Sequence, residues 1–242
     1  MKQYGLIGYP LTHSFSPKYF ADKFAAEGIS DSTYHLFPLQ TIQQLPQLFV
    51  TQPNLQGLNV TIPYKEAVLP YLHQLDATVE AIGAVNCIKV DKGKLIGYNT
   101  DAYGFEVSLN HLINHKPDMA FVLGTGGAAK AVWYVLNKLG IPFVRVSTRH
   151  ASDSIGYAEI AQHLQASNLI VNTTPLGMYP NVNECPELPY HLLTAHDYLF
   201  DLIYNPAETL FMHKGKEQGA AVMNGQLMLE QQAEQSWQVW NS

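Results

Sequence analysis

The stretch "AFVLGTGGAAKAVWYVLNKLG", residues 120–140, decides the fold of the second half of the chain. An apolar run of strand character meets a glycine-rich turn, and a helix-length segment follows it. In the G-x-G-x-x-[GA] spacing, Gly124 permits the tight turn, Gly126 lets the backbone approach a pyrophosphate, and Ala129 lets the helix pack closely on its strand. Because the first N–H groups of the helix face that anion, the pattern predicts a dinucleotide-binding βα unit. A glycine-rich loop without a ligand is the alternative.

The next expected strand, "PFVRVST" (142–148), bears on which dinucleotide is bound. An NAD-binding unit usually has Asp or Glu at the end of this strand, where the carboxylate accepts a hydrogen bond from the ribose 2′-OH. This chain has Ser147, Thr148 and Arg149 there. Arg149 suits a 2′-phosphate, which a carboxylate would repel. The pattern therefore favours NADP over NAD, and an ordinary exposed arginine is the alternative for Arg149.

Apolar runs and helix-length segments alternate along the chain, which favours an α/β fold with a largely parallel sheet. The expected strands are 4–9, 32–39, 55–62, 120–124, 142–148, 168–175, 198–204 and 220–224. The helix after the first strand should have Ser16 as N-cap, Pro17 at its first position and Gly28 as its stop. Segment 84–100 predicts a hairpin with Gly93 in its turn. A helix is expected from 105 to 114, and an amphipathic helix with buried tryptophans closes the chain.

The bulk composition limits the classes of function. The chain has 242 residues, 47% hydrophobic and 14% charged, and can bury a sizeable core. Its formal charge of −6 argues against binding to nucleic acid or to an anionic membrane. Cys87 and Cys185 lack metal-ligand spacing and are expected as free thiols in the cytoplasm. No signal peptide or membrane-spanning run is evident, and a monomer and a homodimer both remain open.

Four polar clusters in the N-terminal half lie where an expected strand meets a loop. They are "HSFSP" (13–17), "NVTIPYK" (59–65), "GAVNC" (83–87) and "GYNTDAYGF" (97–105). In a parallel α/β domain, ligands collect at the carboxyl ends of the strands. One small, oxygen-rich molecule is therefore expected to be bound there by a set of polar side chains: Ser14, Ser16, Asn59, Thr61, Lys65, Asn86 and Asp101. Each of them alone is equally consistent with a cap or a turn residue.

These clusters and several later segments resemble the shikimate dehydrogenase family, and the resemblance extends nearly from end to end of the chain. The resemblance rests on eight blocks in the family's order: "THSFSP" (12–17), "NVTIPYK" (59–65), "GAVN" (83–86), "GYNTDAYGF" (97–105), "GTGGAA" (124–129), "VNTTPLGM" (171–178), "DLIYNP" (201–206) and "NGQLMLEQQA" (224–233). It implies a substrate-binding and catalytic domain at 1–102 plus 227–242, and an inserted Rossmann-like NADP-binding domain at 103–226. The last helix would return to the first domain.

The resemblance also implies roles for individual residues. Ser14 and Ser16 would bind the substrate carboxylate, with Tyr204 near it. The ring hydroxyls would be held by Thr61, Asn86, Asp101 and Gln232. Lys65 and Asp101 would form the catalytic pair and would both contact the substrate. NADP would contact residues of the second domain and the last helix: Gly124, Gly126, Gly127, Ala128, Thr148, Arg149, Thr173, Gly225 and Met228.

One departure from the family pattern affects the cofactor. The second basic residue that often follows Arg149 is missing, and Ser152 and Asp153 stand in that region. The preference for NADP is therefore expected to be weaker than is usual in the family.

The implied reaction is the reversible reduction of 3-dehydroshikimate to shikimate with NADPH. Lys65 would either give a proton to the carbonyl oxygen or only stabilise its developing negative charge, and the sequence leaves both roles open. A quinate/shikimate enzyme of broader range, using NAD as well as NADP, is the second hypothesis. A non-catalytic metabolite sensor is the third. No metal is expected, since His111 and His115 fit an exposed helix face better than a ligand pair.

Overall fold

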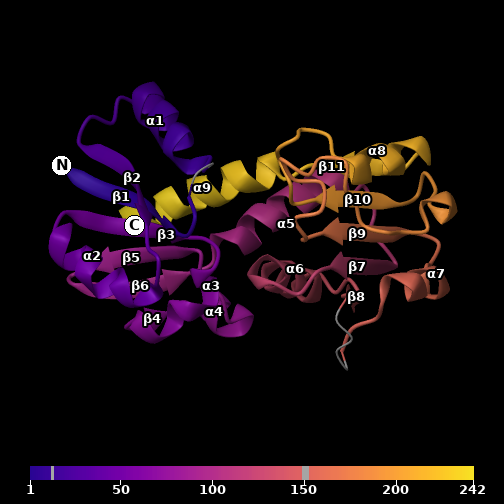
Figure 1. Cartoon of the computed structure of the whole chain (residues 1–242), viewed down its shortest axis with the longest axis horizontal. Helices are drawn as coiled ribbons and strands as arrows, with labels where there is room; N and C mark the ends of the chain where they lie inside the picture. The colour runs from indigo at the N-terminus through magenta and orange to yellow at the C-terminus, as the bar shows by residue number, and fades with distance from the viewer. Residues whose placement is uncertain (12–13, 149–152) are drawn as a thin grey trace. The chain divides into compact units, whose positions relative to one another are not determined.

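The structure is a computed structural model that describes residues 1–11, 14–148 and 153–242 (Figure 1). The chain divides into two compact units. Unit 1 comprises Met1–Thr100 and Gln232–Ser242, and unit 2 comprises Asp101–Gln231. Each unit contains its own sheet, so the chain has the α/β architecture with two sheets that the sequence predicts.

The sheet of unit 1 has the order β2-β1-β3-β5-β6-β4. Its strands are β1 (Lys2–Gly8), β2 (Ser32–Pro38), β3 (Leu55–Val60), β4 (Gln74–Leu75), β5 (Cys87–Asp91) and β6 (Lys94–Tyr98). β1 pairs in parallel with β2 and β3, so the carboxyl ends of these three strands meet at one edge. β5 is antiparallel to β3 and β6, which makes this sheet mixed rather than largely parallel. The predicted hairpin is confirmed, with Gly93 in its turn at φ +78°.

The helices of unit 1 are short. They are α1 (Ser16–Glu27), α2 (Leu45–Thr51), α3 (Tyr64–Ala67) and α4 (Ala77–Ile82), with single 3₁₀ turns at Ile42–Gln44 and Leu69–Tyr71. Gly28 ends α1 in the left-handed conformation, as predicted. The prediction of Ser16 as N-cap is wrong. Phe15 occupies that position without a side-chain cap, and Ser16 is the first residue of the helix and is buried.

The C-terminal helix α9 (Gln226–Asn241) completes the core of unit 1 with its last turns, and Figure 1 shows it beside the sheet. Trp240 stacks on Tyr4 with 4.8 Å between ring centroids and donates its indole N–H to the Ile88 carbonyl at 3.0 Å. A Cβ at Gly57 would lie 2.3 Å from the Trp240 ring, so the helix reaches this close only because β3 has a glycine there. Residues remote in sequence therefore close the core.

The sheet of unit 2 is entirely parallel, in the order β11-β10-β9-β7-β8. Its strands are β7 (Met119–Leu123), β8 (Phe143–Val146), β9 (Asn168–Asn172), β10 (Tyr198–Asp201) and β11 (Ala221–Met223). Its helices are α5 (Thr100–Leu112, whose first residue belongs to unit 1), α6 (Gly127–Lys138), α7 (Ile160–His163) and α8 (Leu210–Glu217), with 3₁₀ turns at Tyr157–Glu159 and Tyr190–Leu192. Because β8 and β9 lie on opposite sides of β7, the strand order reverses there. Doubly wound folds bind nucleotides at the carboxyl end of such a point.

Helix α5 begins at Thr100, five residues before the predicted start at 105. The Thr100 N–H donates to the side chain of Asn86, 14 residues earlier, at 2.6 Å. A first-turn donor is thus satisfied by a residue outside the local sequence, and Asp101 in the first turn suits the helix dipole.

The interpretation of His111 and His115 as one exposed helix face is only half right. His111 is in the last turn of α5, whereas His115 lies beyond the helix end. The His115 ring hydrogen-bonds to the Tyr198 hydroxyl at 2.7 Å and to the Ser167 hydroxyl at 3.0 Å. His115 is thus a structural contact at the amino ends of β9 and β10.

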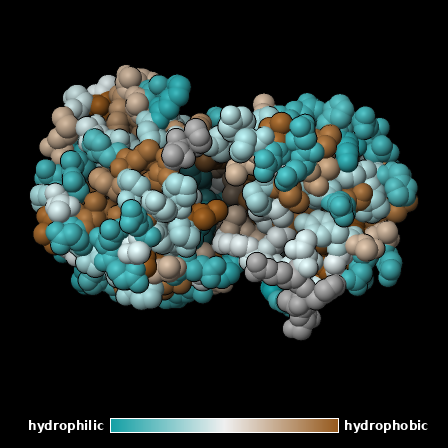
Figure 2. All heavy atoms as spheres, in the orientation of Figure 1, coloured by the Kyte–Doolittle hydropathy of each residue, from teal (hydrophilic) through white to brown (hydrophobic). Residues whose placement is uncertain are grey.

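The visible surfaces of both units are mostly hydrophilic, with apolar side chains scattered among polar ones (Figure 2). Among the described residues, no helix combines the length and the apolar character needed to cross a bilayer.

Candidate active site

The end of β3 places Thr61 and Lys65. Thr61 follows the strand directly, and its N–H donates to the Ile7 carbonyl of β1 at 2.9 Å. Lys65 is the second residue of α3, and its carbonyl accepts from the Val85 N–H at 2.7 Å. Both side chains are only partly exposed. Lys65 is therefore held at the carboxyl edge of the parallel strands, where α/β domains bind their ligands.

The first turn of α1 supplies the serines predicted to bind a carboxylate. Ser14 is half-buried just before the helix, and Ser16 is 8% exposed. Burial raises the pKa of Tyr34, and the nearby Ser16 side chain offsets part of that rise. Thr12 and His13, which begin the "THSFSP" block, lie outside the described part of the chain.

Asn86 and Gln232 are brought together although 146 residues separate them. Both are buried, at 3% and 8% exposed. The Asn86 Nδ2 donates to Gln232 Oε1 over 3.4 Å, and its Oδ1 accepts from the Thr100 N–H at 2.6 Å. Two amide side chains at one place can recognise adjacent hydroxyl groups, because each amide offers both a donor and an acceptor.

Asp101 and Tyr204 belong to unit 2. Asp101 is 7% exposed in the first turn of α5, and Tyr204 is half-buried after β10, where burial raises its pKa. The pairing of Asp101 with Lys65 therefore stays a prediction.

The glycine-rich turn after β7 fits a dinucleotide. Gly124 has φ +102°, and a Cβ there would lie 2.7 Å from Thr173 Oγ1. The same Thr173 hydroxyl donates to the Leu123 carbonyl at 2.6 Å, which fixes the turn from a neighbouring strand. Gly126 caps α6 in an extended conformation, and a Cβ on it would meet nothing within 4 Å. Backbone N–H groups beside an open cradle are what a pyrophosphate requires.

Gly124 and Gly126, the two glycines of the turn after β7, are followed directly by α6. Gly127 is the first residue of that helix, and Ala128 follows it half-buried. Ala129 is fully buried, as close packing of the helix on β7 requires.

At the end of β8, Thr148 is exposed, whereas Arg149 lies outside the described residues. The stem of this loop is held by Arg145, which forms an ion pair with Asp153 and lies 4.0 Å from the centre of the Trp133 ring. The carboxylate of Asp153, in the described part of this loop, is thus paired with the Arg145 guanidinium.

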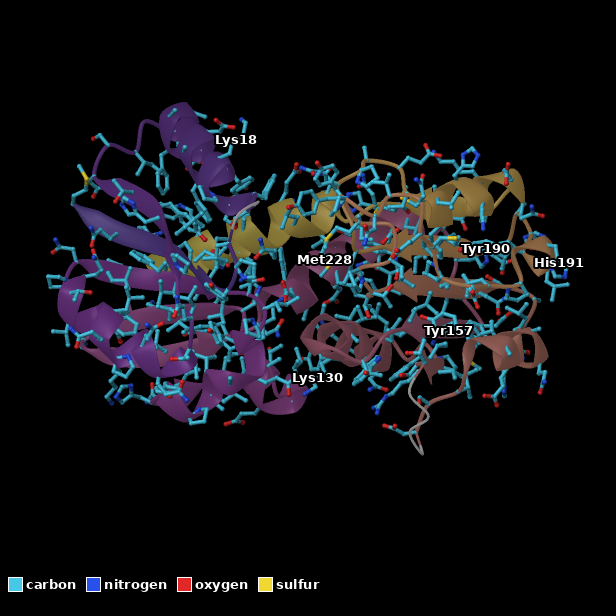
Figure 3. All side chains as sticks on the ribbon, viewed as in Figure 1. Lys18, Lys130, Tyr157, Tyr190, His191 and Met228 are labelled. Carbon is cyan, nitrogen blue, oxygen red and sulfur yellow. The ribbon has the colours of Figure 1, made fainter. Side chains whose placement is uncertain are left out.

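The start of α9 carries two predicted cofactor residues. Gly225 donates its N–H to the Ile203 carbonyl at 3.0 Å, and a Cβ there would lie 2.1 Å from the Leu202 carbonyl oxygen. Only glycine permits this approach of two backbones. Met228, labelled on α9 in Figure 3, is 7% exposed.

The sequence interpretation missed Asp201, the last residue of β10, although it begins the "DLIYNP" block. Its carboxylate is fully buried and accepts from Asn172 Nδ2 at 3.1 Å, from the Ile203 N–H at 3.1 Å and from the Thr209 hydroxyl at 2.6 Å. Asp201 thereby fixes the loop that carries Tyr204. The sequence signal that could have identified it is an acidic residue at the end of an otherwise apolar strand. A buried carboxylate requires hydrogen-bond donors in the protein.

Burial raises the pKa of Asp201 from 3.8 to about 6, against the lowering effect of its three hydrogen bonds. The protonated form is therefore favoured in the folded state, and this contribution to stability is present below about pH 4 and lost as the pH rises through 6. We expect Asp201→Asn to be independent of this titration. Between pH 4 and 7 the stability of the variant relative to the parent should rise by about 2 kcal/mol, measured by urea unfolding. A difference that does not vary with pH would contradict the assignment.

Comparison with known proteins agrees with this geometry. The family model of the shikimate dehydrogenase substrate binding domain matches residues 6–88. The shikimate dehydrogenase (NADP(+)) of Carboxydothermus hydrogenoformans is 38% identical, covering 98% of this chain and 90% of its own. A chorismate mutase/shikimate 5-dehydrogenase fusion protein from Clostridium acetobutylicum is 37% identical with a TM-score of 0.88, covering 100% and 91%. The shikimate 5-dehydrogenase of Thermus thermophilus, solved with NADP(H) and shikimate, is 29% identical with a TM-score of 0.86, covering 99% and 93%.

Proposed function

Because the chain belongs to the shikimate dehydrogenase family, we propose that it catalyses the NADP-dependent, reversible reduction of 3-dehydroshikimate to shikimate. The observation that carries this proposal is the end-to-end match to an NADP-dependent relative, over 98% of the chain. The open cradle at Gly126 and the buried amides of Asn86 and Gln232 support it independently, since a dinucleotide and a polyhydroxylated ring need such groups.

In this proposal the substrate carboxylate is bound by Ser14 and Ser16, with Tyr204 near it. Hydroxyl donors suit a carboxylate that must be held without a full countercharge. The ring hydroxyls are bound by Thr61, Asn86, Asp101 and Gln232. The domain assignment follows: residues 1–102 with 227–242 bind the substrate, and 103–226 bind the dinucleotide.

The dinucleotide would be held at the turn from Gly124 to Ala128, at Thr148, Arg149 and Thr173, and by Gly225 and Met228. The chemistry it would supply there is hydride transfer. The chain itself must stabilise the oxygen of the carbonyl group as negative charge develops on it. The Lys65 ammonium does this, either by electrostatics alone or by giving up a proton, and Asp101 orients it. If Lys65 gives up a proton in this direction, its neutral amine takes the hydroxyl proton in the reverse direction.

A two-by-two assay tests the proposal. Purified protein is mixed with NADP⁺ or NAD⁺ and with shikimate or quinate, and the near-ultraviolet absorbance of the reduced nicotinamide is followed. Turnover with shikimate and NADP⁺ well above the other three combinations is expected. Comparable turnover of quinate would favour the broader quinate/shikimate enzyme. No turnover in any of the four combinations would favour a non-catalytic metabolite-binding protein.

Cofactor preference should depend on Arg145. In Arg145→Met the carboxylate of Asp153 loses its ion-pair partner and faces the expected 2′-phosphate region with its charge unbalanced. We expect kcat/KM for NADP⁺ relative to NAD⁺ to fall by about threefold, the size of one exposed unit charge acting through solvent. The double variant Arg145→Met, Asp153→Asn should recover the parent ratio. Equal ratios in all three proteins would rule out this electrostatic role.

A further inference from the structure

A chain of buried hydrogen bonds runs through unit 1 between the two groups of proposed substrate residues. It begins near Ser16, at the Tyr34 hydroxyl, which donates to Asn59 Oδ1 at 2.8 Å. Asn59 Nδ2 then donates to the Ser236 hydroxyl at 2.9 Å. The chain continues through side chains of α9, of α5 and of the loop before β5: Ser236 to Thr100 at 3.0 Å, Thr100 to Asn86 at 2.9 Å and Asn86 to Gln232 at 3.4 Å. Tyr34, Ser236 and Thr100 have no role in the mechanism given above.

Three backbone groups determine the direction of these bonds. The Thr100 N–H can only donate, so the oxygen of the Asn86 amide must face it at 2.6 Å. The Asn86 carbonyl can only accept, so the nitrogen of the Asn59 amide faces it at 3.3 Å. The Gln232 carbonyl, likewise an acceptor, takes the hydrogen of the Ser236 hydroxyl at 2.8 Å. The orientation of both amides therefore follows from the fold.

The hydroxyl directions then follow by exclusion. Ser236 has used its hydrogen on the Gln232 carbonyl and can only accept from Thr100 and Asn59. Thr100 therefore donates to Ser236, and its oxygen accepts from Asn86 Nδ2. One N–H of Asn86 is fixed in this way, and the other is directed at Gln232 Oε1 over 3.4 Å, a length at which a hydrogen bond is weak and easily exchanged.

We propose that Thr100 and Ser236 are positioning residues for substrate binding, because they hold the Asn86 amide with an N–H directed at the hydroxyl-binding site. This inference rests on the proposed function. It adds that Asn86 acts there as a donor, so that the substrate oxygen which it contacts accepts the bond and keeps its own hydrogen for another partner. Gln232 Oε1, to which Asn86 donates in the absence of substrate, supplies such an acceptor.

The first test separates the Thr100 hydroxyl from the Thr100 volume. Thr100→Val keeps the shape and removes the hydroxyl, so that Asn86 Nδ2 loses the nearer of the two acceptors described above and keeps Gln232 Oε1. The KM for shikimate should rise about tenfold, the equivalent of one hydrogen bond, while kcat and the KM for NADP⁺ change by less than about threefold. Thr100→Ser restores the hydroxyl and should return the KM for shikimate to within about twofold of the parent.

Ser236→Ala has a matched control within the chain. Ser236 and Ser108 are both 0% exposed, and each donates to the carbonyl four residues earlier in its helix at 2.8 Å. Only Ser236 also accepts from the network. Ser236→Ala should raise the KM for shikimate about threefold, less than Thr100→Val because Thr100 can turn its hydrogen to Asn86 Oδ1 at 3.3 Å. Ser108→Ala should affect only the melting temperature.

The outcomes distinguish this inference from the proposed function. If Thr100→Val and Thr100→Ser raise the KM equally, or if Ser236→Ala behaves as Ser108→Ala does, the network is merely structural and the inference is overturned while the parent activity stands. If the parent neither turns over shikimate nor binds it by calorimetry, the proposed function is wrong and the positioning role falls with it. A fall in kcat without a rise in KM would also overturn the inference.

Discussion

Replacing Lys65 by methionine is expected to lower kcat by about 10³-fold, within the range that a positioned acid or a charge-stabilising donor contributes. The KM for shikimate should change by less than about threefold, because the carboxylate and ring hydroxyls are bound by other residues. Methionine keeps the length of the side chain and removes only its ammonium group. Steady-state kinetics in the direction of shikimate oxidation, with saturating NADP⁺, give both parameters.

Lys65→Arg separates the two roles that remain for this residue. An arginine stays protonated throughout the accessible pH range, so it can stabilise negative charge but cannot give up a proton. If Lys65 acts only as an electrostatic group, Lys65→Arg should recover much of the activity that Lys65→Met loses. If Lys65 transfers the proton, the two variants should be equally slow. Lys94→Met, at an exposed lysine of β6, is the control and should be fully active.

An unchanged kcat in Lys65→Met would remove Lys65 from the mechanism. A loss confined to KM would assign it to substrate binding alone. Thermal unfolding of each variant shows whether a loss of activity comes from a loss of structure, which is not expected at a partly exposed position in a four-residue helix.

Local spacing made part of this site predictable. The positions of Gly124, Gly126 and Ala129 follow from the geometry of one strand, one turn and one helix, and a few adjacent residues contain all of that information. The structure agrees in each case: a positive φ at Gly124, open space at Gly126 and a fully buried Ala129. Lys65 became a candidate on similar grounds, because it lies in the short helix that follows β3, whose carboxyl end carries polar residues.

Contacts between remote residues set the limit of that reasoning. Asn86 satisfies the first N–H of α5, so a helix start at Thr100 cannot be seen in residues 100–105 alone. Ser16 has the position and type of an N-cap, yet it is the buried first residue of α1, and Phe15 precedes it at the cap position. Asp201 is likewise a buried carboxylate that accepts three hydrogen bonds. Two of its donors, Asn172 and Thr209, come close to it only in the folded chain.

Gly126→Val should weaken cofactor binding about 100-fold while leaving the fold intact. The backbone of Gly126 is extended, with φ −77° and ψ −177°, a conformation that suits a β-branched residue, and the added Cβ meets no protein atom within 4 Å. The loss of stability should not exceed about 1 kcal/mol, the size of a helix-cap effect. The valine side chain would instead occupy the cradle, and losing one or two charge-assisted hydrogen bonds to a phosphate should raise the KM for NADP⁺ about 100-fold.

Gly124→Ala, two residues away, is the contrasting variant. Gly124 has φ +102°, and the Cβ of an alanine there would lie 2.7 Å from Thr173 Oγ1. Both features strain the protein itself, so this change should lower the free energy of unfolding by about 1–3 kcal/mol. Unfolding curves recorded with and without NADP⁺ separate the two effects. Ligand-induced stabilisation should disappear in Gly126→Val, whose curve without ligand resembles that of the parent. If NADP⁺ stabilises Gly126→Val as strongly as the parent, the space beside Gly126 does not receive the pyrophosphate, and the dinucleotide must bind elsewhere on unit 2.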